Sequence, residues 1–514
     1  MPEYRVFGPP GTGKTTWLSK QVDRALYKHA PDEIAACSFT RAAAVELAGR
    51  DTGLPKHNIG TIHSLCYHAL GLPPIAEVTP EFIEDWTAGH PQYSIKTKSG
   101  EATLDERPAE CTALMSWNRV RGMRSKLVPD AYFAAQWEAA KERAGVLDFT
   151  DLLLRAPEAL AGIKVLFVDE AQDLTPLQWQ IVRQWGASAE TFIVCGDDDQ
   201  LLYQFLGADA ETFLADLGDS QKRTLSHSYR LPRAVWEYAE QWIRKLGDRR
   251  EPKEYQPRDK AGEVCRPEFR LDKPVPLVHE IRDRAAAGES VMLLASCGYM
   301  LAPLIQALRD EGVPYHNPYR RARGDWNPIR TIGSRALAFL QTCRQIEEPQ
   351  QPAVRWWPWV EMLRTDGALE RGCKKELRVR AQRYDMLTED DLLRWITPEL
   401  LTAIDQQDMT WLHQHATTRF QDALDFPLRV LRNSGETALR TPPKVIVGTI
   451  HSVKGGEADN VYVFPDLSRQ AYDALSRTPQ PERDALVRLA YVAMTRARRR
   501  LALCAPGSRL FWRW

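Results

Sequence analysis

The sequence predicts an α/β protein with two parallel-sheet cores, each interrupted by a mostly helical insertion. Short, continuously apolar runs such as Val165–Val168 recur between helix-like segments, and such runs are typical of parallel strands covered on both faces. This alternation is lost and regained twice along the chain, which predicts the two insertions. A glycine-rich loop follows the first apolar stretch, where a strand would lead into a helix.

The pattern divides the chain into six expected segments. The first core is expected over residues 1–70 and 147–215, with an insertion over 71–146; the second core is expected over 216–318 and 441–514, with an insertion over 319–440. A length of 514 residues is enough for roughly three to five structural units.

Apolar runs and helical periodicity locate the elements of the first core. Strands are expected at Ile34–Ser38, near Ile59–His63, at Val165–Val168 and at Thr191–Cys195. Helices are expected from Thr15 to Ala30, over Ala42–Arg50, from Ser64 onward and over Asp148–Leu154. In the insertion, the segment Tyr132–Glu142 is also helix-like.

The second core repeats the pattern after Arg223. Helices are expected at Ala234–Lys245, Leu301–Asp310 and Glu482–Arg498, and strands at Ser290–Ala295, Lys444–Val447, Val461–Phe464 and Leu501–Cys504. Residues Gly247–Gly262 are polar and are expected to form a linker.

Composition excludes several classes of protein. No apolar run approaches the roughly 20 residues that span a bilayer, so no membrane span is expected. The nine cysteines form no C-x-x-C pair, which argues against a zinc ribbon or an iron–sulfur cluster and favours a cytoplasmic protein. The 68 basic and 68 acidic residues balance, which is mild evidence against a nucleic-acid binder, although a local groove can carry a positive field.

Gly8 to Thr15 read Gly-Pro-Pro-Gly-Thr-Gly-Lys-Thr, the pattern G-x-x-x-x-G-K-[ST] of a phosphate-binding loop. Backbone N–H groups of such a loop surround the phosphates of a nucleoside triphosphate; Lys14 would reach the terminal ones and Thr15 would bind Mg²⁺. The expected nucleotide-binding residues are Gly8, Pro9, Pro10, Gly11, Thr12, Gly13, Lys14, Thr15 and Thr16.

Two acidic residues, Asp169 and Glu170, follow an apolar strand, where ligands bind along a parallel sheet. Asp169 would hold Mg²⁺ and Glu170 would polarise the attacking water in a phosphoryl transfer. The alternative is a plain acidic helix start. Gln200 ends the next strand and would sense the terminal phosphate; the alternative there is a polar turn.

Arg230 and Arg496 lie far from the loop in sequence. A second core facing the first would bring both guanidinium groups to the γ-phosphate as arginine fingers. The alternative is that both are ordinary surface residues.

An ordered series of motifs gives these residues a common context. In chain order it comprises Ser38–Ala44, Gly60–Ser64, Asp148–Leu153, Val168–Asp173, Gly196–Ala208, Ser228–Arg230, Gly448–Glu457 and Tyr491–Ala497. In wording and order the series resembles the superfamily 1 DNA helicases of the UvrD/Rep/PcrA type, and the resemblance covers nearly the whole chain outside the two insertions.

The resemblance implies two RecA-like domains that bind ATP between them and single-stranded DNA across them. Tyr229 would stack on the adenine and Glu457 would contact the ribose. Aromatic residues would stack on bases, a sequence-independent contact worth about 1–3 kcal/mol per base; the alternative for the phenylalanines is core packing. The residues that the resemblance places on the DNA side are Phe39, Thr40, Arg41, Thr61, His63, Tyr203, Phe205, Thr449 and His451.

The implied function is ATP-dependent 3′→5′ translocation on single-stranded DNA with unwinding at single-strand/duplex junctions. The family usually has Trp at position Phe205 and Arg at Leu206. Leu206 and the short second insertion favour an alternative, a DNA-stimulated ATPase that translocates or loads a protein partner and unwinds little. A helicase–nuclease subunit is a weaker alternative, and a P-loop ATPase of another kind leaves Thr449–Glu457 and Tyr491–Ala497 unexplained.

Overall fold

The computed structural model describes most of the chain. The described residues are 3–39, 53–71, 78–93, 95, 112–126, 128–155, 160, 162–208, 210–215, 218, 221–247, 249–320, 326–364, 368–477 and 480–514. The candidates Thr40 and Arg41 and the predicted helix Ala42–Arg50 lie outside these residues.

The chain forms two compact units. The first comprises Met1–Glu268, Met292–Met300 and Gly448–Trp514; the second comprises Phe269–Val291 and Leu301–Val447. The six-segment division drawn from the sequence remains a prediction. Among the described residues, no helix is both long and apolar enough to cross a membrane.

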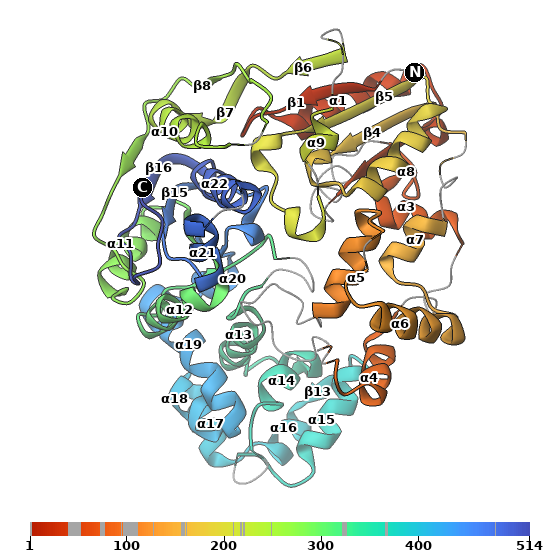
Figure 1. The fold of residues 1–514 in the computed structure, drawn as a ribbon. Helices are drawn as coiled ribbons and strands as arrows, with labels where there is room; N and C mark the ends of the chain where they lie inside the picture. The colour runs from red at the N-terminus through yellow and green to blue at the C-terminus, as the bar shows by residue number, and fades with distance from the viewer. Residues whose placement is uncertain are drawn as a thin grey trace. The chain divides into compact units, whose positions relative to one another are not determined.

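The first sheet has six strands in the order β3-β2-β4-β5-β1-β6, and neighbouring strands run parallel (Figure 1). Its strands are β1 (Tyr4–Phe7), β2 (Ile34–Ser38), β3 (Ile59–Thr61), β4 (Val165–Asp169), β5 (Thr191–Gly196) and β6 (Lys222–Thr224). All residues of β2 and β4 are buried, as expected for strands covered on both faces.

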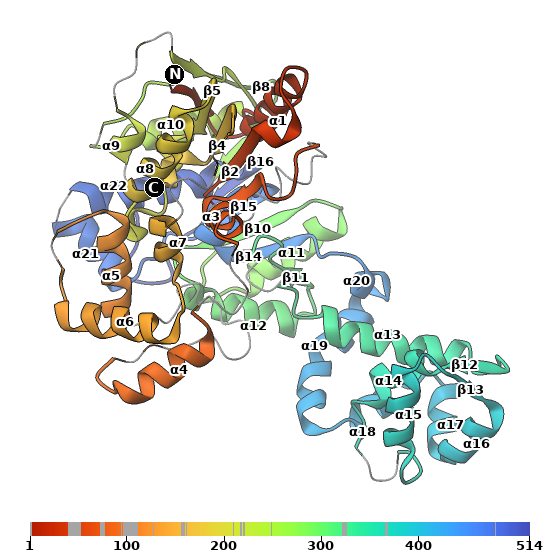
Figure 2. The same cartoon turned by 90° about the vertical axis from the view of Figure 1, so that its right-hand side faces the viewer.

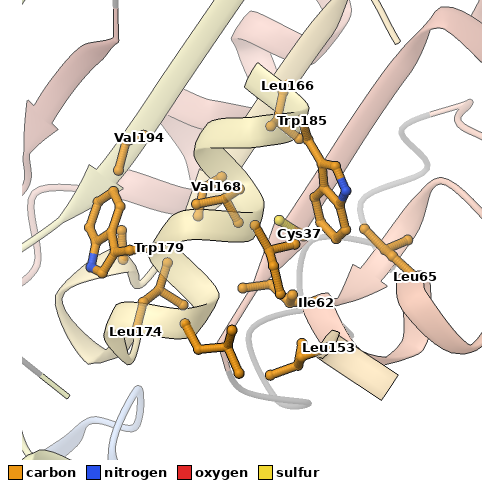
Figure 3. Close-up of a cluster of buried hydrophobic side chains, with 14 of the residues drawn as sticks. Cys37, Ile62, Leu65, Leu153, Leu166, Val168, Leu174, Trp179, Trp185 and Val194 are labelled. Carbon is orange, nitrogen blue, oxygen red and sulfur yellow. The ribbon is translucent and has the colours of Figure 1, made fainter. Parts of the chain in front are cut away.

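Helices and a buried cluster complete this part of the first unit. The helices are α1 (Lys14–Leu26), α3 (Ile62–Ala69), α7 (Phe149–Arg155), α8 (Pro176–Ala187) and α9 (Ala210–Phe213), and the predicted insertion contains α4 (Pro80–Gly89), α5 (Thr112–Gly122) and α6 (Ala131–Ala144). Figure 3 shows Val168 and Val194 of the sheet close to Trp179 and Trp185 of α8 within this cluster.

The second sheet also has six strands, in the order β11-β14-β10-β15-β16-β9. They are β9 (Glu263–Cys265), β10 (Val291–Ala295), β11 (Tyr315–His316), β14 (Val445–Thr449), β15 (Ala458–Val463) and β16 (Ala497–Leu503). The first unit also contains β7 (His227–Pro232), β8 (Gln256–Arg258), α10 (Arg233–Ile243), α21 (Arg469–Arg477) and α22 (Gln480–Met494). Two large parallel sheets in one chain confirm the predicted α/β class.

The prediction was wrong at the end of α22, which stops at Met494 rather than Arg498. Residues from Ala497 onward instead form β16, which pairs with β15 and β9. The side chains of Thr495 and Arg496 both donate hydrogen bonds to the carbonyl of Val492, at 3.1 and 2.9 Å. These bonds satisfy a carbonyl in the last turn, so the helix ends there despite the arginine-rich continuation.

The second unit is mostly helical. Its elements besides β11 are α11 (Val275–Ala286), α12 (Ala302–Asp310), α13 (Arg330–Arg344), α14 (Ala353–Val360), α15 (Cys373–Gln382), α16 (Glu389–Trp395), α17 (Pro398–Asp405), α18 (Met409–His415), α19 (Thr418–Ser434), α20 (Thr437–Arg440) and the antiparallel pair β12 (Gln350–Pro352) and β13 (Met386–Thr388). Figure 2 shows α13 to α17 gathered around this pair. Trp356 and Trp359 are buried in their common core.

Candidate nucleotide and nucleic-acid site

The register of the first sheet brings the candidate residues to one edge. Phe7 lies opposite Gly196, and Ser38 lies opposite both Asp169 and Thr61. Because the strands are parallel, the segments that follow them start at the same edge, where ligands bind to open α/β sheets.

The loop after β1 is held in shape by β7. Gly11 and Gly13 have φ values of 73° and 76°, in the left-handed region that glycine adopts without strain. The hydroxyl of Ser228 donates to the carbonyl of Pro10 at 2.7 Å, and the N–H of Tyr229 donates to the carbonyl of Gly11 at 2.8 Å. A Cβ atom at Gly11 would lie 2.3 Å from the Cβ of Arg230, so this close approach requires glycine.

Lys14 folds back over the start of the loop. A Cβ atom at Gly8 would lie 1.8 Å from Cγ of Lys14, so the missing side chain makes room for the lysine. The Nζ atom of Lys14 lies 3.0 Å from Oε1 of Glu170. Burial alone would lower the pKa of Lys14, but Glu170 and Asp169 raise it above its usual value, and the lysine stays charged.

The oxygens of Thr15 and Asp169 lie side by side. Oγ1 of Thr15 is 3.4 Å from Oδ2 of Asp169, and Oδ1 of Asp169 accepts from the N–H of Glu170 at 2.9 Å. A hydroxyl and a carboxylate form the hard oxygen set that Mg²⁺ prefers. The residues present therefore fit a magnesium ion.

Glu170 is held by three neighbours. Its φ of 53° is left-handed, which costs a residue other than glycine about 1–3 kcal/mol and is often found at functional sites. Its carboxylate contacts Lys14, Lys454 at 3.3 Å and the amide of Gln172 at 2.8 Å. Burial would raise the pKa of Glu170, but Lys14 and Lys454 hold it well below its usual range, so the side chain is ionised at neutral pH.

The side chain of Gln200 connects Arg496 with Asp197, the residue that follows β5. Its Nε2 donates to Oδ2 of Asp197 at 2.7 Å, and its Oε1 accepts from Nη2 of Arg496 at 2.9 Å. Arg496 is buried, so it is not the surface residue that the alternative interpretation required. Burial and the nearby Arg230 guanidinium both lower the pKa of Arg496.

Arg230 is directed toward Glu457 in this structure. Its Nε donates to Oε2 of Glu457 at 2.8 Å, while Oε1 of Glu457 accepts from Arg498 at 3.2 Å. The ring of Tyr229 comes within 3.9 Å of where a Cβ on Gly13 would be and is otherwise 71% exposed. An exposed ring beside the loop is open to stacking by a planar base.

Four of the DNA-side candidates form a continuous row of rings. Ring centroids are 5.1 Å apart for Phe39 and Tyr203, 6.0 Å for Tyr203 and Phe205, and 5.8 Å for Phe205 and His451. Phe39 and Tyr203 pack against the buried cluster, as the core-packing alternative expects for Phe39, whereas Phe205 is 48% exposed.

Lys454 connects this row with the nucleotide side. Besides Glu170 it contacts Asp173 and the carbonyl of Gln200, the latter at 3.1 Å, and its Nζ lies 5.3 Å from the centre of the Tyr203 ring. The sequence places Lys454 inside a motif but does not single it out as a functional residue. An isolated lysine after a loop gives no signal that it is buried among carboxylates.

The other described candidates of the first core, Thr61 and His63, lie at the start of α3. The Thr61 hydroxyl accepts from the N–H of Ser64 at 3.1 Å and caps α3. The ring of His63 contacts Phe149 edge-on at 5.5 Å, and Phe149 is 65% exposed. Burial lowers the pKa of His63 to about 4, and Asp148 offsets only part of this effect, so the imidazole is neutral at physiological pH.

The start of α7 is fixed by a cluster of charges. Asp148, Asp151 and Glu138 bring carboxylate oxygens within 4.8 Å of one another, a spacing at which they could hold a cation. Lys141 contacts all three carboxylates, and Arg121 does the same. Two protein cations therefore offset most of the negative charge of the three carboxylates, and the ion pairs tie the start of α7, which carries Phe149, to α5 and α6.

Two family models and several curated proteins match the sequence of this chain. The family model described as AAA domain matches residues 2–206, and the model described as UvrD-like helicase C-terminal domain matches residues 394–506. The ATP-dependent DNA helicase UvrD2 of Mycobacterium tuberculosis (strain ATCC 25618 / H37Rv) is 25% identical over 98% of this chain and 77% of its own length. DNA helicase II of Escherichia coli (strain K12) is 26% identical over 44% of this chain and 36% of its own length. The ATP-dependent DNA helicase PcrA of Bacillus subtilis (strain 168) is 25% identical over 47% of this chain and 37% of its own length.

Proposed function

Because the chain belongs to the UvrD/Rep/PcrA-type superfamily 1 DNA helicases, which hydrolyse ATP, we propose that it uses ATP to translocate 3′→5′ along single-stranded DNA. The observation that carries this proposal is the path from Glu170 through Lys454 to the ring of Tyr203. A group that touches both the hydrolytic carboxylate and the row of rings can pass a change at one to the other.

On the nucleotide side, each side chain has a separate task. The loop Gly8–Thr16 binds the phosphates, Tyr229 stacks on the base and Glu457 holds the ribose. Thr15 and Asp169 would hold Mg²⁺, which would neutralise charge on the phosphates. Since Glu170 is ionised and its pKa is depressed, it orients and polarises a water molecule rather than storing its proton.

The two arginines and Gln200 respond to the terminal phosphate. Arg496 already contacts Gln200, while Arg230 is held by Glu457 at 2.8 Å. Phosphate binding would compete with Glu457 for Arg230, and the arginine would then stabilise the charge that develops on the transferred group.

On the DNA side, Phe39, Tyr203, Phe205 and His451 provide one surface for bases, and Thr61, His63 and Thr449 contact the strand nearby. Phe205 is the ring with the most exposed face among the first three. Stacking is blind to sequence, as a motor that passes every base requires.

Lys14→Ala tests the site. The variant is expected to lose DNA-stimulated ATP hydrolysis, because Lys14 is the loop lysine expected to reach the terminal phosphates. Lys20→Ala is the matched control, since Lys20 lies exposed on the same helix α1. ATPase activity is measured with polydeoxynucleotide, with polyribonucleotide and without nucleic acid. Wild-type hydrolysis by Lys14→Ala would refute the site, and stimulation by RNA alone would refute the DNA substrate.

A second candidate function is translocation or partner loading with little unwinding. Leu206, where relatives of this type usually carry Arg, is 44% exposed and offers no charge to a DNA phosphate. Displacing streptavidin from a biotinylated strand requires only translocation, whereas displacing an annealed strand requires unwinding. A protein that does only the first has this second function.

A further inference from the structure

We propose that Lys253, in the segment between α10 and β8, is a positioning residue for ATP hydrolysis that sets the Gln200 amide through Asp197. The proposal rests on the function proposed above. Residues Gly247–Gly262 belong to none of the sequence motifs and were expected to form a polar linker.

The Lys253 side chain is 1% exposed and enters a group of three consecutive aspartates at the end of β5. Its Nζ atom lies 3.1 Å from Oδ1 of Asp197, 2.5 Å from Oδ1 of Asp198 and 2.8 Å from Oδ2 of Asp199. Lysine is almost never this buried without a partner, and here one ammonium has three.

Asp197 has two oxygens with two different tasks. Lys253 holds Oδ1, while Oδ2 accepts from the Gln200 amide at 2.7 Å. The other end of the same amide accepts from Arg496 at 2.9 Å. Lys253 is therefore two contacts away from Gln200 and three from Arg496.

The surroundings keep Lys253 and its aspartates in place. Arg250 donates to both oxygens of Asp199, at 2.7 and 2.9 Å, and also contacts Glu240 at 3.3 Å. On the other side, Nε of Arg488 in α22 donates to the carbonyl of Asp198 at 3.1 Å. The turn that carries Gln200 is thus held between the segment after α10 and the helix that leads to Arg496.

The charges of the group explain why the lysine cannot be neutral. Asp197, Asp198 and Asp199 are all buried. Burial raises the pKa of Asp198 to about 6 even with Lys253 beside it, while the three carboxylates raise the pKa of Lys253. Loss of the lysine would leave the turn with an excess of buried negative charge.

If Lys253 only stabilised the fold, restoring stability would restore activity; if it positions Gln200, it would not. Lys253→Met is expected to lower the thermal midpoint because it leaves carboxylates uncompensated. Lys253→Met combined with Asp198→Asn restores the charge balance, since Asp198 does not contact Gln200. This double variant is expected to recover the thermal midpoint, yet its kcat for DNA-stimulated ATPase should stay about 10–100-fold below that of Asp198→Asn alone, with little change in KM.

Coupling to Gln200 completes the test. In a Gln200→Ala background, the same exchange at Lys253 should leave kcat nearly unchanged, because the amide that Lys253 positions is gone. Lys260→Met, an exposed lysine of the same segment, is the control and should behave as wild type. A double variant with the kcat of Asp198→Asn, or an equal loss in the Gln200→Ala background, would overturn the inference. If instead the wild type shows no DNA-stimulated ATPase, it is the proposed function that fails.

Discussion

Two places in the first unit share the five-residue sequence Gly-Thr-Ile-His-Ser, at Gly60–Ser64 and at Gly448–Ser452. Each follows or ends a parallel strand, and each closes the same turn. The serine hydroxyl donates to the threonine carbonyl at 2.8 Å in both copies, and the threonine hydroxyl accepts from the serine N–H, at 3.1 Å in the first copy and 3.3 Å in the second. The local sequence therefore determines the turn.

The two copies differ in the segment after the turn. The first copy starts the eight-residue helix α3, whereas the second starts only a three-residue 3-10 turn, His451–Val453. Gly455, with a φ of 87°, prevents the helix from continuing. Two residues after the shared sequence, the first copy has Cys66, which is buried in the core. At the equivalent position the second copy has Lys454, which contacts carboxylates. Through Lys454 the second copy is connected to Glu170 and Asp173.

The largest effect is expected for a substitution at Lys454, which removes the contacts that distinguish the second copy from the first. Lys454→Met removes the cation from the buried carboxylate of Asp173 and the partly buried carboxylate of Glu170, and breaking a buried pair costs about 3–5 kcal/mol of stability. The variant should therefore melt at a lower temperature and lose stimulation of its ATPase by DNA. Cys66→Ser, at the same position of the first copy, is the control for DNA stimulation, which it should retain. Full stimulation in Lys454→Met would show that the two copies do not differ in this way.

The histidine of the first copy, His63, is expected to make the stability of the protein depend on pH. Folding lowers the pKa of His63 from 6.5 to about 4, so between these values the unfolded chain binds the proton more readily. The free energy of unfolding should fall as pH drops from 6.5 to 4, by an amount on the order of 1–3 kcal/mol from this group. In His63→Gln the fall should be smaller by that amount. The thermal midpoints of the wild type and of His63→Gln are measured at pH 7 and at pH 5. An equal drop in midpoint for the two proteins would contradict the prediction.

The rings beside the histidines test whether both copies face DNA. Phe149 contacts His63 and Phe205 contacts His451, and both phenylalanines are exposed. If each stacks on a base, then Phe149→Ala and Phe205→Ala should each weaken single-stranded DNA binding by about 1–3 kcal/mol. Tyr27→Ala is the control, because Tyr27 is an 89% exposed ring at the end of α1. Fluorescence anisotropy with a labelled oligonucleotide measures the affinities. A loss at Phe205 alone would restrict the DNA surface to the second copy.

The sequence predicted what depends on local patterns. Apolar runs located the strands, and glycines and acidic pairs after them located the nucleotide-side candidates Lys14, Asp169 and Glu170, which the structure brings together. It did not predict partners that meet across long separations. Lys253 lies in a segment whose own sequence predicts a linker, because its partners, Asp197–Asp199, lie in the turn after β5, more than fifty residues earlier in the chain. Nothing in a lysine's neighbours along the chain reveals that it is buried.

The smallest expected effect concerns the caps themselves. Thr61 caps a helix of eight residues through a 3.1 Å hydrogen bond, so Thr61→Ala should cost about 1 kcal/mol. Thr449 closes a three-residue turn through a longer bond of 3.3 Å, and Thr449→Ala should cost about 0.5 kcal/mol. Chemical denaturation measures both, with Thr→Ser at each position as the variant that keeps the hydroxyl. Because the five residues of the two copies are identical, a smaller loss of stability in Thr449→Ala would be due to the shorter element that follows the turn. Equal losses in the two variants would mean that the turn alone determines how much the threonine hydroxyl stabilises the protein.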